Sequence, residues 1–230
     1  MEPNEPSKPG CFVESFLSPT FEQWSYLLGK QGREDVLVVD PGFRTGLLLD
    51  AIRHRNLRLA AILNTHGHSD HIAGNRTLKE AFPDAPLVIG RNEAHLLTDP
   101  VANLSAAFGQ NLISPPADQL VDDKEILELA GFVLEVREIP GHSPGSVVFV
   151  VRNESPLIVI GGDVLFAGSI GRFDFPGGDG HLLVNGIRSK LFDLPDDTRV
   201  LPGHGPETTI GTERVRNPYV GERAEQYRLD

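Results

Sequence analysis

Short apolar runs, separated by turn residues, dominate the first half of the chain and predict strands. The runs at 36–39 and 59–63 are continuously apolar, which is typical of strands that are covered on both faces. Similar runs predict further strands at 12–16, 24–28 and 87–89. Strands that alternate with helical segments favour a mixed arrangement of sheets and helices.

Two helices are expected between these strands. Thr45 is placed to cap a helix that runs through Leu48, Leu49 and Ile52, because a threonine hydroxyl can accept a hydrogen bond from a free helix N–H group. A second helix is expected over 72–81, directly after a group of histidines.

Closely spaced strands are the main feature of the second half. They are expected at 126–129, 133–139, 147–151, 157–160 and 199–201, with one helix over 182–192. Residues 91–118 are the least regular part and predict one or two short helices and a loop that ends at Ser114-Pro115-Pro116. The whole pattern predicts two sheets packed face to face with helices outside.

The composition is that of an ordinary globular protein. The 230 residues are 40% hydrophobic and 23% charged, and no repeat or linker divides the chain. We expect a disordered lead over 1–10, which is rich in proline and glutamate, and a single domain over 11–230.

Charge and hydropathy narrow the possible partners. A net charge of −11 without a clustered basic face disfavours a nucleic-acid partner. No apolar run approaches the ~20 residues of a membrane span, and residues 1–10 lack the apolar core of a signal peptide. Cys11 is the only cysteine, so no intrachain disulfide can form, and a cytoplasmic location is the simplest expectation.

The segment 65–71, Thr-His-Gly-His-Ser-Asp-His, carries the clearest chemical signal. Three histidines and an aspartate lie within six residues, immediately after a predicted strand. In an extended segment His66 and His68 point to the same side. Imidazole and carboxylate groups are the ligands that suit zinc and its neighbours, so this segment predicts a metal site.

Three more candidates follow predicted strands and stand next to glycines: His142, Asp163 and His204. Strand ends are where mixed α/β folds place their chemistry. Asp40 is expected to accept a hydrogen bond from a ligand imidazole, and a simple turn role before Pro41 is the alternative. Of the remaining histidines, His54 and His95 are interpreted as surface residues, and the role of His181 stays open.

The pattern His66-x-His68-x-Asp70-His71, followed by His142, Asp163 and His204, resembles the metallo-β-lactamase-fold hydrolases. The resemblance implies an α/β (α+β) fold, a four-layer αβ/βα sandwich of two mixed sheets with helices outside. It also implies two divalent metal ions with a hydroxide between them. Zinc is the first expectation, and iron or manganese accept the same ligands. By this resemblance, His66, His68 and His142 match the residues that hold the first ion. Asp70, His71 and His204 match those that hold the second, and Asp163 matches the residue that bridges the two.

The segment 162–174 resembles the glyoxalase II family (hydroxyacylglutathione hydrolases), especially its short bacterial form. There a basic residue contacts glutathione, and Arg172 stands at that place, so Arg172 and Phe173 are the predicted substrate contacts. An ion pair of Arg172 with Asp174 or Asp179 is the alternative. Three departures concern glutathione binding. Asp174 replaces one family tyrosine, and Pro206 or its neighbours replace a second. The C-terminal helical domain of the larger enzymes is not expected here. The common zinc β-lactamases carry a cysteine in the region of the second metal. This chain has none there, which disfavours antibiotic hydrolysis.

The function that the resemblance implies is hydrolysis of a thioester, such as S-lactoylglutathione, to a hydroxy acid and a free thiol. Asp70 and Asp163, with the bridging hydroxide, would be the catalytic groups. A thiolate, whose conjugate acid has a pKa of about 8.5, leaves without a general acid. The alternatives are a glutathione-persulfide dioxygenase with one iron at His66, His142 and Asp163, a lactonase with an apolar tunnel from 91–118, and a non-catalytic metal-binding protein. A small-molecule substrate is expected, with no nucleic-acid or membrane partner.

Overall fold

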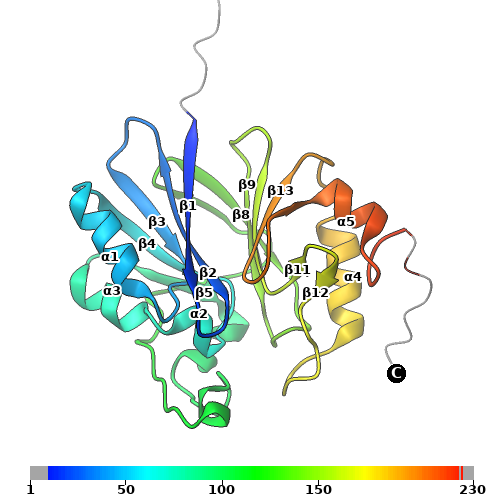
Figure 1. Cartoon of the computed structure of the whole chain (residues 1–230), viewed down its shortest axis with the longest axis horizontal. Coiled ribbons are helices and arrows are strands. Elements are labelled where there is room, and N and C mark those ends of the chain that lie inside the picture. The colour runs from blue at the N-terminus through cyan, green and yellow to red at the C-terminus, as the bar shows by residue number, and fades with distance from the viewer. Residues whose placement is uncertain (1–9, 223, 225–230) are drawn as a thin grey trace, which may run out of the picture.

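Two six-stranded sheets form the centre of the molecule, with helices on their outer faces (Figure 1). They are seen in a computed structural model of the chain, which describes residues 10–222 and 224. The predicted disordered lead therefore lies outside the described residues except for Gly10, and the domain expected over 11–230 stays a prediction.

The first sheet combines an antiparallel and a parallel half. Its order is β1 (Cys11–Ser18), β2 (Gln23–Lys30), β3 (Asp35–Val39), β4 (Arg58–Asn64), β5 (Leu87–Gly90) and β6 (Gln119–Val121). The first three strands are antiparallel, and β3 to β6 are parallel. The parallel strands β3 and β5 are buried along their whole length, as their continuous apolar runs predict.

The second sheet is antiparallel apart from one pair. Its order is β14 (Thr208–Thr209), β13 (Arg199–Pro202), β10 (Ile158–Gly162), β9 (Val147–Val151), β8 (Phe132–Glu138) and β7 (Ile126–Leu129). The exception is the parallel pairing of β10 with β13. A separate small hairpin joins β11 (Leu165–Phe166) and β12 (Ser169–Ile170).

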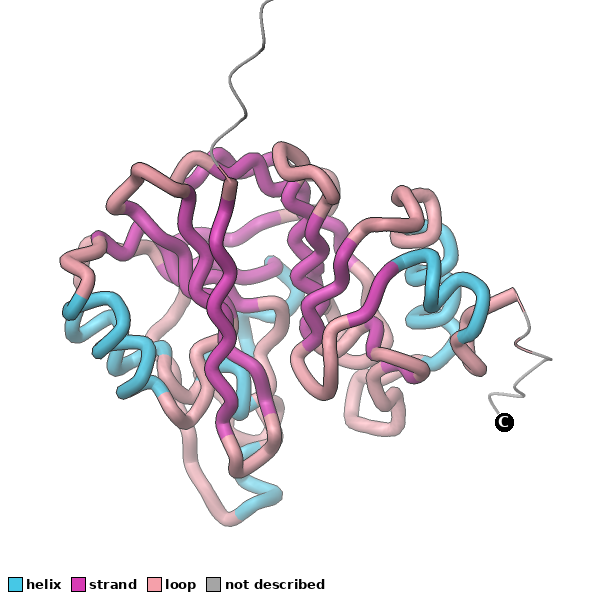
Figure 2. Tube along the Cα trace, turned by 45° about the horizontal axis from the view of Figure 1, so that its top comes forward, coloured by secondary structure: helices cyan, strands magenta, loops and turns pink. Residues whose placement is uncertain are grey.

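The helices complete a four-layer sandwich, and this confirms the predicted architecture (Figure 2). The helical segments are α1 (Thr45–His54), α2 (Ser69–Ile72), α3 (Asn75–Ala81), α4 (Gly180–Lys190) and α5 (Ile210–Arg216), with 3₁₀ turns η1 (Arg91–Leu97) and η2 (Ser105–Phe108). One apolar cluster fills the space between the sheets, a second lies under α1 and α3, and a third lies under α4. Burial of these apolar faces, rather than helix propensity, holds the short helices in place.

Two local predictions were wrong. Thr45 does not cap α1 but is its first residue, because its hydroxyl donates a hydrogen bond to the carbonyl of Gly42 at 2.7 Å. The single helix expected over 72–81 is divided into α2 and α3, because Gly74 packs directly against Pro41 and donates its N–H to the Pro41 carbonyl at 2.7 Å. The short strands β6 and β14 and the helix α5 were not predicted.

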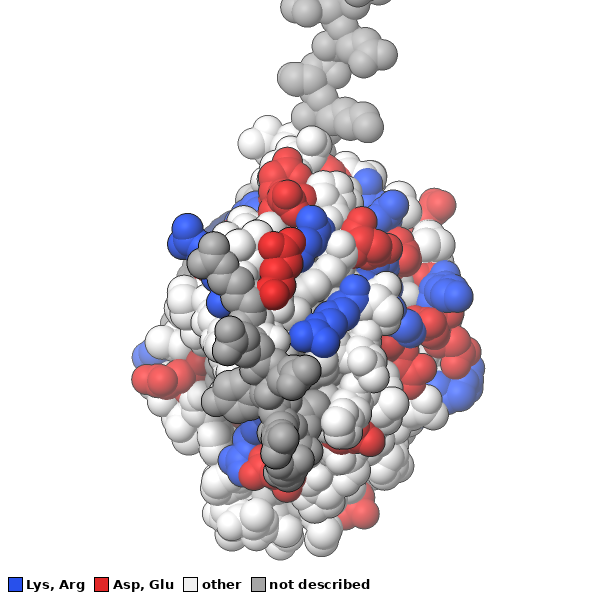
Figure 3. Space-filling model, turned by 90° about the vertical axis from the view of Figure 1, so that its right-hand side faces the viewer, with Lys and Arg blue, Asp and Glu red and all other residues white. Residues whose placement is uncertain are grey.

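Acidic and basic side chains are interspersed on the face that carries α4 and α5 (Figure 3). Several of them form ion pairs, among them Arg214 with Asp196. In the described part of the chain, each helix is too short or too polar to pass through a lipid bilayer.

Candidate metal centre

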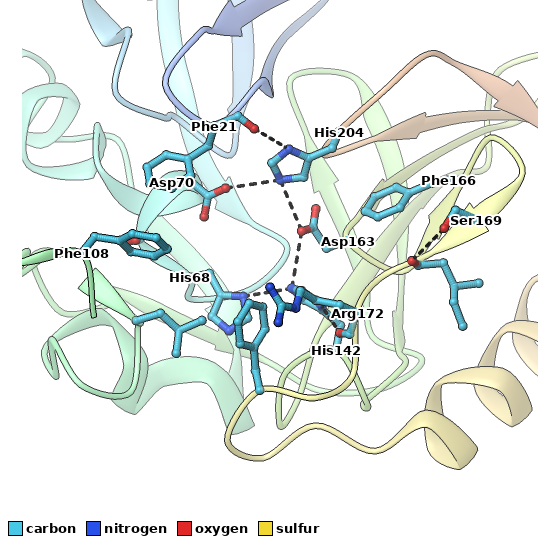
Figure 4. Close-up of a pocket in the computed structure, with 14 residues that line it drawn as sticks. Phe21, His68, Asp70, Phe108, His142, Asp163, Phe166, Ser169, Arg172 and His204 are labelled. Atoms are coloured by element: carbon cyan, nitrogen blue, oxygen red, sulfur yellow. Dashed lines mark hydrogen bonds and ion pairs between the residues drawn. The ribbon is translucent and has the colours of Figure 1, made fainter. Parts of the chain in front are cut away.

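Four loops from the two sheets meet and bring the seven predicted ligand residues together. Figure 4 shows the five that line the cavity in front of them: His68, Asp70, His142, Asp163 and His204. The loop after β4 and the start of α2 supply His66, His68, Asp70 and His71. The second sheet supplies the other three residues, after β8, β10 and β13: His142, Asp163 and His204. Residues spread over the segment 66–204 thus meet at one end of the sandwich, where the strands of both sheets end.

The first group is made of three imidazoles. Ligand atoms of His66, His68 and His142 lie within 4.8 Å of one another, and all three side chains are buried. The closest approach is 2.9 Å between His68 Nδ1 and His142 Nε2. Three nitrogens that converge in this way match the protein share of a tetrahedral site with one open position.

The second group contains a carboxylate. Asp70, His71 and His204 also place ligand atoms within 4.8 Å of one another. His204 Nε2 lies 3.3 Å from Asp70 Oδ2 and 3.4 Å from His71 Nε2. A group with an aspartate carries more negative charge than the first group, so the two differ in their affinity for cations.

Asp163 lies between the groups and contacts both. One of its oxygens, Oδ2, is 3.5 Å from His142 Nε2 and 3.4 Å from His204 Nε2. The other, Oδ1, is 3.3 Å from His71 Nε2. A carboxylate with its two oxygens directed at both groups is suited to bridge two cations.

Hydrogen bonds on the outer side of the rings orient the imidazoles. The Nδ1 atoms of His142 and His204 lie 2.8 Å from the carbonyl oxygen of Arg172 and 3.0 Å from that of Phe21. Because a carbonyl only accepts, both Nδ1 atoms carry a proton, and each Nε2 is the ring atom that faces the cluster and could bind a cation.

Asp40 orients the imidazole of His71 in the same way. Its Oδ2 lies 3.0 Å from His71 Nδ1, and the same carboxylate accepts hydrogen bonds from the N–H and the hydroxyl of Thr65 at 2.8 and 2.6 Å. Asp40 has a positive φ of 47°, an uncommon conformation for a residue with a side chain, in the turn before Pro41. Both the turn and the contact with an imidazole are therefore present at this residue.

The first group is held in its neutral form. Burial lowers the pKa of His68 to about 3, and the neighbouring imidazole of His142 adds to this effect. Burial also lowers the pKa of His142 and brings that of His66 well below its ordinary value. A neutral imidazole is the form that binds a metal ion, so these residues need not lose a proton on binding.

Charge balance dominates the second group. Burial alone would lower the pKa of His71, but Asp163, Asp70 and Asp40 outweigh it and raise the pKa well above its ordinary value. For His204 the same carboxylates, Asp163 and Asp70, outweigh burial and raise the pKa to about 10. Protons on the two imidazoles thus offset the buried carboxylates, and bound cations would take over that task.

Two further observations fit a metal ion. His66 Nε2 is buried and has no hydrogen-bond partner among the described residues, which would cost about 1–3 kcal/mol if nothing else bound it. A Cβ atom on Gly203 would overlap Asp163 Oδ1 and the ring of His71, so only glycine lets this backbone pass so close to the cluster.

Glu93 joins two of the ligand loops, and the sequence analysis missed it. This fully buried residue accepts hydrogen bonds from Gly67 N–H at 2.8 Å, Gly145 N–H at 2.6 Å and the hydroxyl of Ser143 at 2.8 Å. Gly67 lies between His66 and His68, and Ser143 follows His142. No sequence signal marks Glu93, because a glutamate in a short polar segment is usually exposed.

A cavity of about 380 Å³ lies in front of the cluster. His66 and His71 lie behind its surface, and its described lining consists of Phe21, His68, Ser69, Asp70, Leu104, Phe108, His142, Asp163, Phe166, Ser169, Ile170, Arg172, Phe175 and His204. Leu104 and Phe108 come from the irregular region 91–118.

The two predicted substrate contacts differ in position. Arg172 lines the cavity, and its guanidinium donates two hydrogen bonds of 2.8 Å to Asp174, the pairing considered as its alternative role. Phe173 is not among the lining residues and packs against the apolar cluster under α4, whereas Phe175 does line the cavity.

The other histidines lie apart from the cluster. His54 and His95 are exposed, in agreement with their interpretation as surface residues. His181, whose role was left open, is also exposed, at the start of α4.

Comparison with known proteins gives the family. The model of the metallo-beta-lactamase superfamily matches residues 19–204. The chain belongs to this superfamily. It is therefore a member of a group of metal-dependent hydrolases, and the matched range includes all seven clustered residues.

Relatives and solved structures agree with this assignment. The chain is 40% identical over 188 residues to a probable metallo-hydrolase, YqgX, of Bacillus subtilis (81% of this chain and 88% of that protein). It is 36% identical over 198 residues to the hydroxyacylglutathione hydrolase GloC of Haemophilus influenzae (83% and 90%). The BLEG-1 B3 metallo-beta-lactamase superimposes with a TM-score of 0.85 at 36% identity (91% and 99%). TTHA1623 in a di-iron-bound form gives 0.77 at 34% identity (90% and 99%).

Glu93→Gln is expected to destabilise the protein and to weaken metal retention. The amide places a donor where Gly67 or Gly145 already donates, so one buried hydrogen bond is lost, at a cost of about 1–3 kcal/mol. Chemical denaturation would measure the free energy of unfolding, and elemental analysis would measure bound metal. Glu80→Gln, at an exposed position on α3, is the matched control, and equal behaviour of the two variants would contradict the role of Glu93.

Proposed function

We propose that the chain is a dinuclear metal-dependent hydrolase that cleaves a thioester, such as S-lactoylglutathione, to a hydroxy acid and a free thiol. The observation that carries the proposal is the contact of Asp163 with both ligand groups, since a single ion would need only one of them. The similarity to a protein named hydroxyacylglutathione hydrolase supports the choice of a thioester.

The ligands divide into two sets. His66, His68 and His142 would hold one cation, and Asp70, His71 and His204 would hold the other. Asp163 would be shared between them. Zinc suits this mixture of nitrogen and oxygen donors, and iron or manganese accept it as well, as the di-iron form of a similar structure illustrates.

The residues at the floor of the cavity would carry out distinct tasks. When bound, the two cations would supply an activated water and a Lewis acid for the thioester carbonyl. Asp70 and Asp163 line the cavity, so their carboxylates can accept a proton of the entering water and orient its lone pair toward that carbonyl. His142 and His204, held by carbonyl oxygens, would keep the ligand geometry fixed during turnover.

Departure of the thiol needs little help from the protein. A thiol has a pKa of about 8.5, so its thiolate is a good leaving group near neutral pH. The described residues that line the cavity include no lysine or tyrosine that could donate a proton. An amide, whose leaving group must be protonated, would be a poorer substrate for such a site.

Recognition of glutathione would fall to Arg172. Its guanidinium can bind a carboxylate with two parallel hydrogen bonds, and it lies at the cavity next to Phe175, 4.0 Å from the ring centre. The ion pair with Asp174 is 60% and 65% exposed on its two sides, and such pairs contribute only about 0–1 kcal/mol. A substrate carboxylate could therefore displace Asp174 at small cost.

Removal of a ligand is expected to abolish activity. His68→Ala or Asp163→Ala should lower kcat/KM for a thioester by more than about 100-fold and should lower the bound metal. Loss of a residue that only hydrogen-bonds a metal ligand costs up to about 100-fold, so loss of a ligand itself should cost more. Turnover assays and elemental analysis measure both effects. His95→Ala, at an exposed histidine outside the cluster, should leave both unchanged. Full activity in either ligand variant would exclude the assigned centre.

Arg172→Ala should raise KM for S-lactoylglutathione about tenfold and change kcat less, because a charged hydrogen bond to the substrate is lost at an exposed position. Asp174→Asn should leave KM equal or lower it, since it frees the guanidinium from its partner. Steady-state kinetics of the two variants would test this, and an unchanged KM in Arg172→Ala would show that Arg172 does not bind the substrate.

Metal content separates hydrolysis from the dioxygenase alternative. The purified chain, loaded with metal, should hold two ions per chain and should release thiol from a thioester without consuming oxygen. Elemental analysis and an oxygen electrode measure these quantities. One iron per chain, with oxygen uptake in the presence of glutathione persulfide, would replace the hydrolase by the dioxygenase.

A further inference from the structure

The walls of the cavity are mostly apolar, in contrast to its floor, although Ser169 and Arg172 also line it. Four aromatic rings and two aliphatic side chains surround the charged cluster: Phe21, Phe108, Phe166, Phe175, Leu104 and Ile170. In Figure 4 the rings of Phe108 and Phe166 lie on opposite sides of the cluster, and Phe21 lies beside Asp70 and His204. A ligand that reaches the cluster must therefore pass between apolar surfaces.

Two of these rings contact imidazoles of the metal-ligand cluster. Phe175 packs edge-on against His68 at 5.4 Å between ring centres, and Phe166 packs edge-on against His204 at 6.1 Å. Phe21 packs edge-on against Phe108, with 5.2 Å between the ring centres. An apolar group bound between them would contact the walls as soon as its polar end reached the ligand imidazoles.

The loop that carries Leu104 and Phe108 is fixed in a strained conformation. Leu104 has a φ of +67°, which is a genuine outlier for a bulky side chain and costs about 1–3 kcal/mol. The buried side chain of Asn103 holds this conformation, because it donates to the carbonyls of Leu96 and Leu112 at 3.1 and 3.0 Å and accepts from Ser105 N–H at 3.0 Å. Backbone strain that is held by buried hydrogen bonds is typical of functional segments.

Phe108 leaves apolar area in water. The residue is 58% exposed, although its ring lines the cavity. Covering this ring with an alkyl or aryl group would remove apolar surface from water, which is favourable at about 25 cal/mol per Å². A small hydroxyacyl group such as lactoyl has too little apolar surface to do so.

The charges at the cavity wall do not oppose such a ligand. Arg172 is the one cationic side chain of Lys or Arg type among the described lining residues, and Asp174 already neutralises it. The other ionisable lining residues, among them Asp70 and Asp163, belong to the metal-ligand cluster on the floor. The lining thus matches a molecule with a polar carbonyl at one end and an apolar chain at the other.

We propose that this cavity binds an apolar acyl chain, so that the preferred substrates are thioesters of medium-length alkyl or aryl acids rather than of lactic acid. The inference rests on the proposed function for the bond that is cleaved, and it specifies the acyl side of that bond. The thiol carrier would stay outside, at the exposed end of the cavity near Arg172.

A binding measurement tests the acyl site without turnover. Acetate, butanoate, hexanoate and octanoate, which are products of such thioesters, are titrated calorimetrically into the metal-loaded full-length chain, with lactate for comparison. Burial of each added methylene should lower Kd about threefold, close to the limit for full transfer from water. Lactate should bind no more tightly than acetate. A Kd that does not depend on chain length would overturn the proposal.

Two variants of one loop locate the site. Phe108→Ser should weaken octanoate binding about tenfold and leave acetate binding unchanged, because only the longer chain reaches this ring. Val101→Ser is the matched control, since Val101 is 73% exposed on the same loop and is not among the lining residues. Equal octanoate affinity in the two variants would overturn the assignment of this wall.

Kinetics with acyl thioesters of a single small thiol, N-acetylcysteamine, complete the test. If kcat/KM rises from acetyl to octanoyl in parallel with affinity, both proposals are supported. If thioesters are cleaved at a rate that does not depend on chain length, the hydrolase stands and the acyl preference is wrong. If affinity rises with chain length and no thioester is cleaved, the acyl site stands and the proposed function is wrong.

Discussion

One buried carboxylate, Asp163, determines how the rest of the centre is arranged. Its two oxygens lie 3.3–3.5 Å from imidazole nitrogens of both ligand groups, at a depth where an unbalanced charge would cost several kcal/mol. Burial acts to raise the pKa of Asp163, yet His71 and His204 hold it well below its ordinary range. The carboxylate is thus kept ionised, and the positive charge that keeps it so can come from protons or from cations.

The two sheets are hydrogen-bonded to each other where the ligand loops meet. The N–H of Val147 in the second sheet donates to the carbonyl of Thr65 at 2.8 Å, and the N–H of Trp24 in the first sheet donates to that of Gly203 at 2.7 Å. Glu93 adds a side-chain link between the loops of His66 and His142. Each ligand group includes residues from both sheets, so separation of the sheets would disrupt both groups at once. Metal binding at these groups would therefore be thermodynamically linked to folding.

Local patterns in the sequence predicted two packed sheets and a metal site at residues 66–71, and the family resemblance implied the four layers and the complete set of seven ligands. Continuous apolar runs marked the buried strands, and the histidine spacing marked residues that the structure brings together. Features that depend on tertiary contacts were missed. Thr45 was expected as a cap, but its hydroxyl finds a nearer acceptor in Gly42, and the helix over 72–81 is interrupted where Gly74 meets Pro41. Glu93 carries no local signal at all, since only its burial between two loops reveals it.

The cavity walls were the least predictable part, for a physical reason. Their side chains come from the β1–β2 turn, an irregular loop, the short β11–β12 hairpin and the loop before α4, which are too short or too irregular to show strand or helix periodicity. These loops lie outside the sandwich, whereas the ligands lie at strand ends within it. Under the proposed acyl specificity, a change in Phe108 or Leu104 would alter which acyl group fits without moving Asp163 or the imidazoles. In this proposal the reaction and the choice of substrate are encoded in separate parts of the chain, and such a separation would allow one metal-ligand cluster to serve enzymes with different substrates.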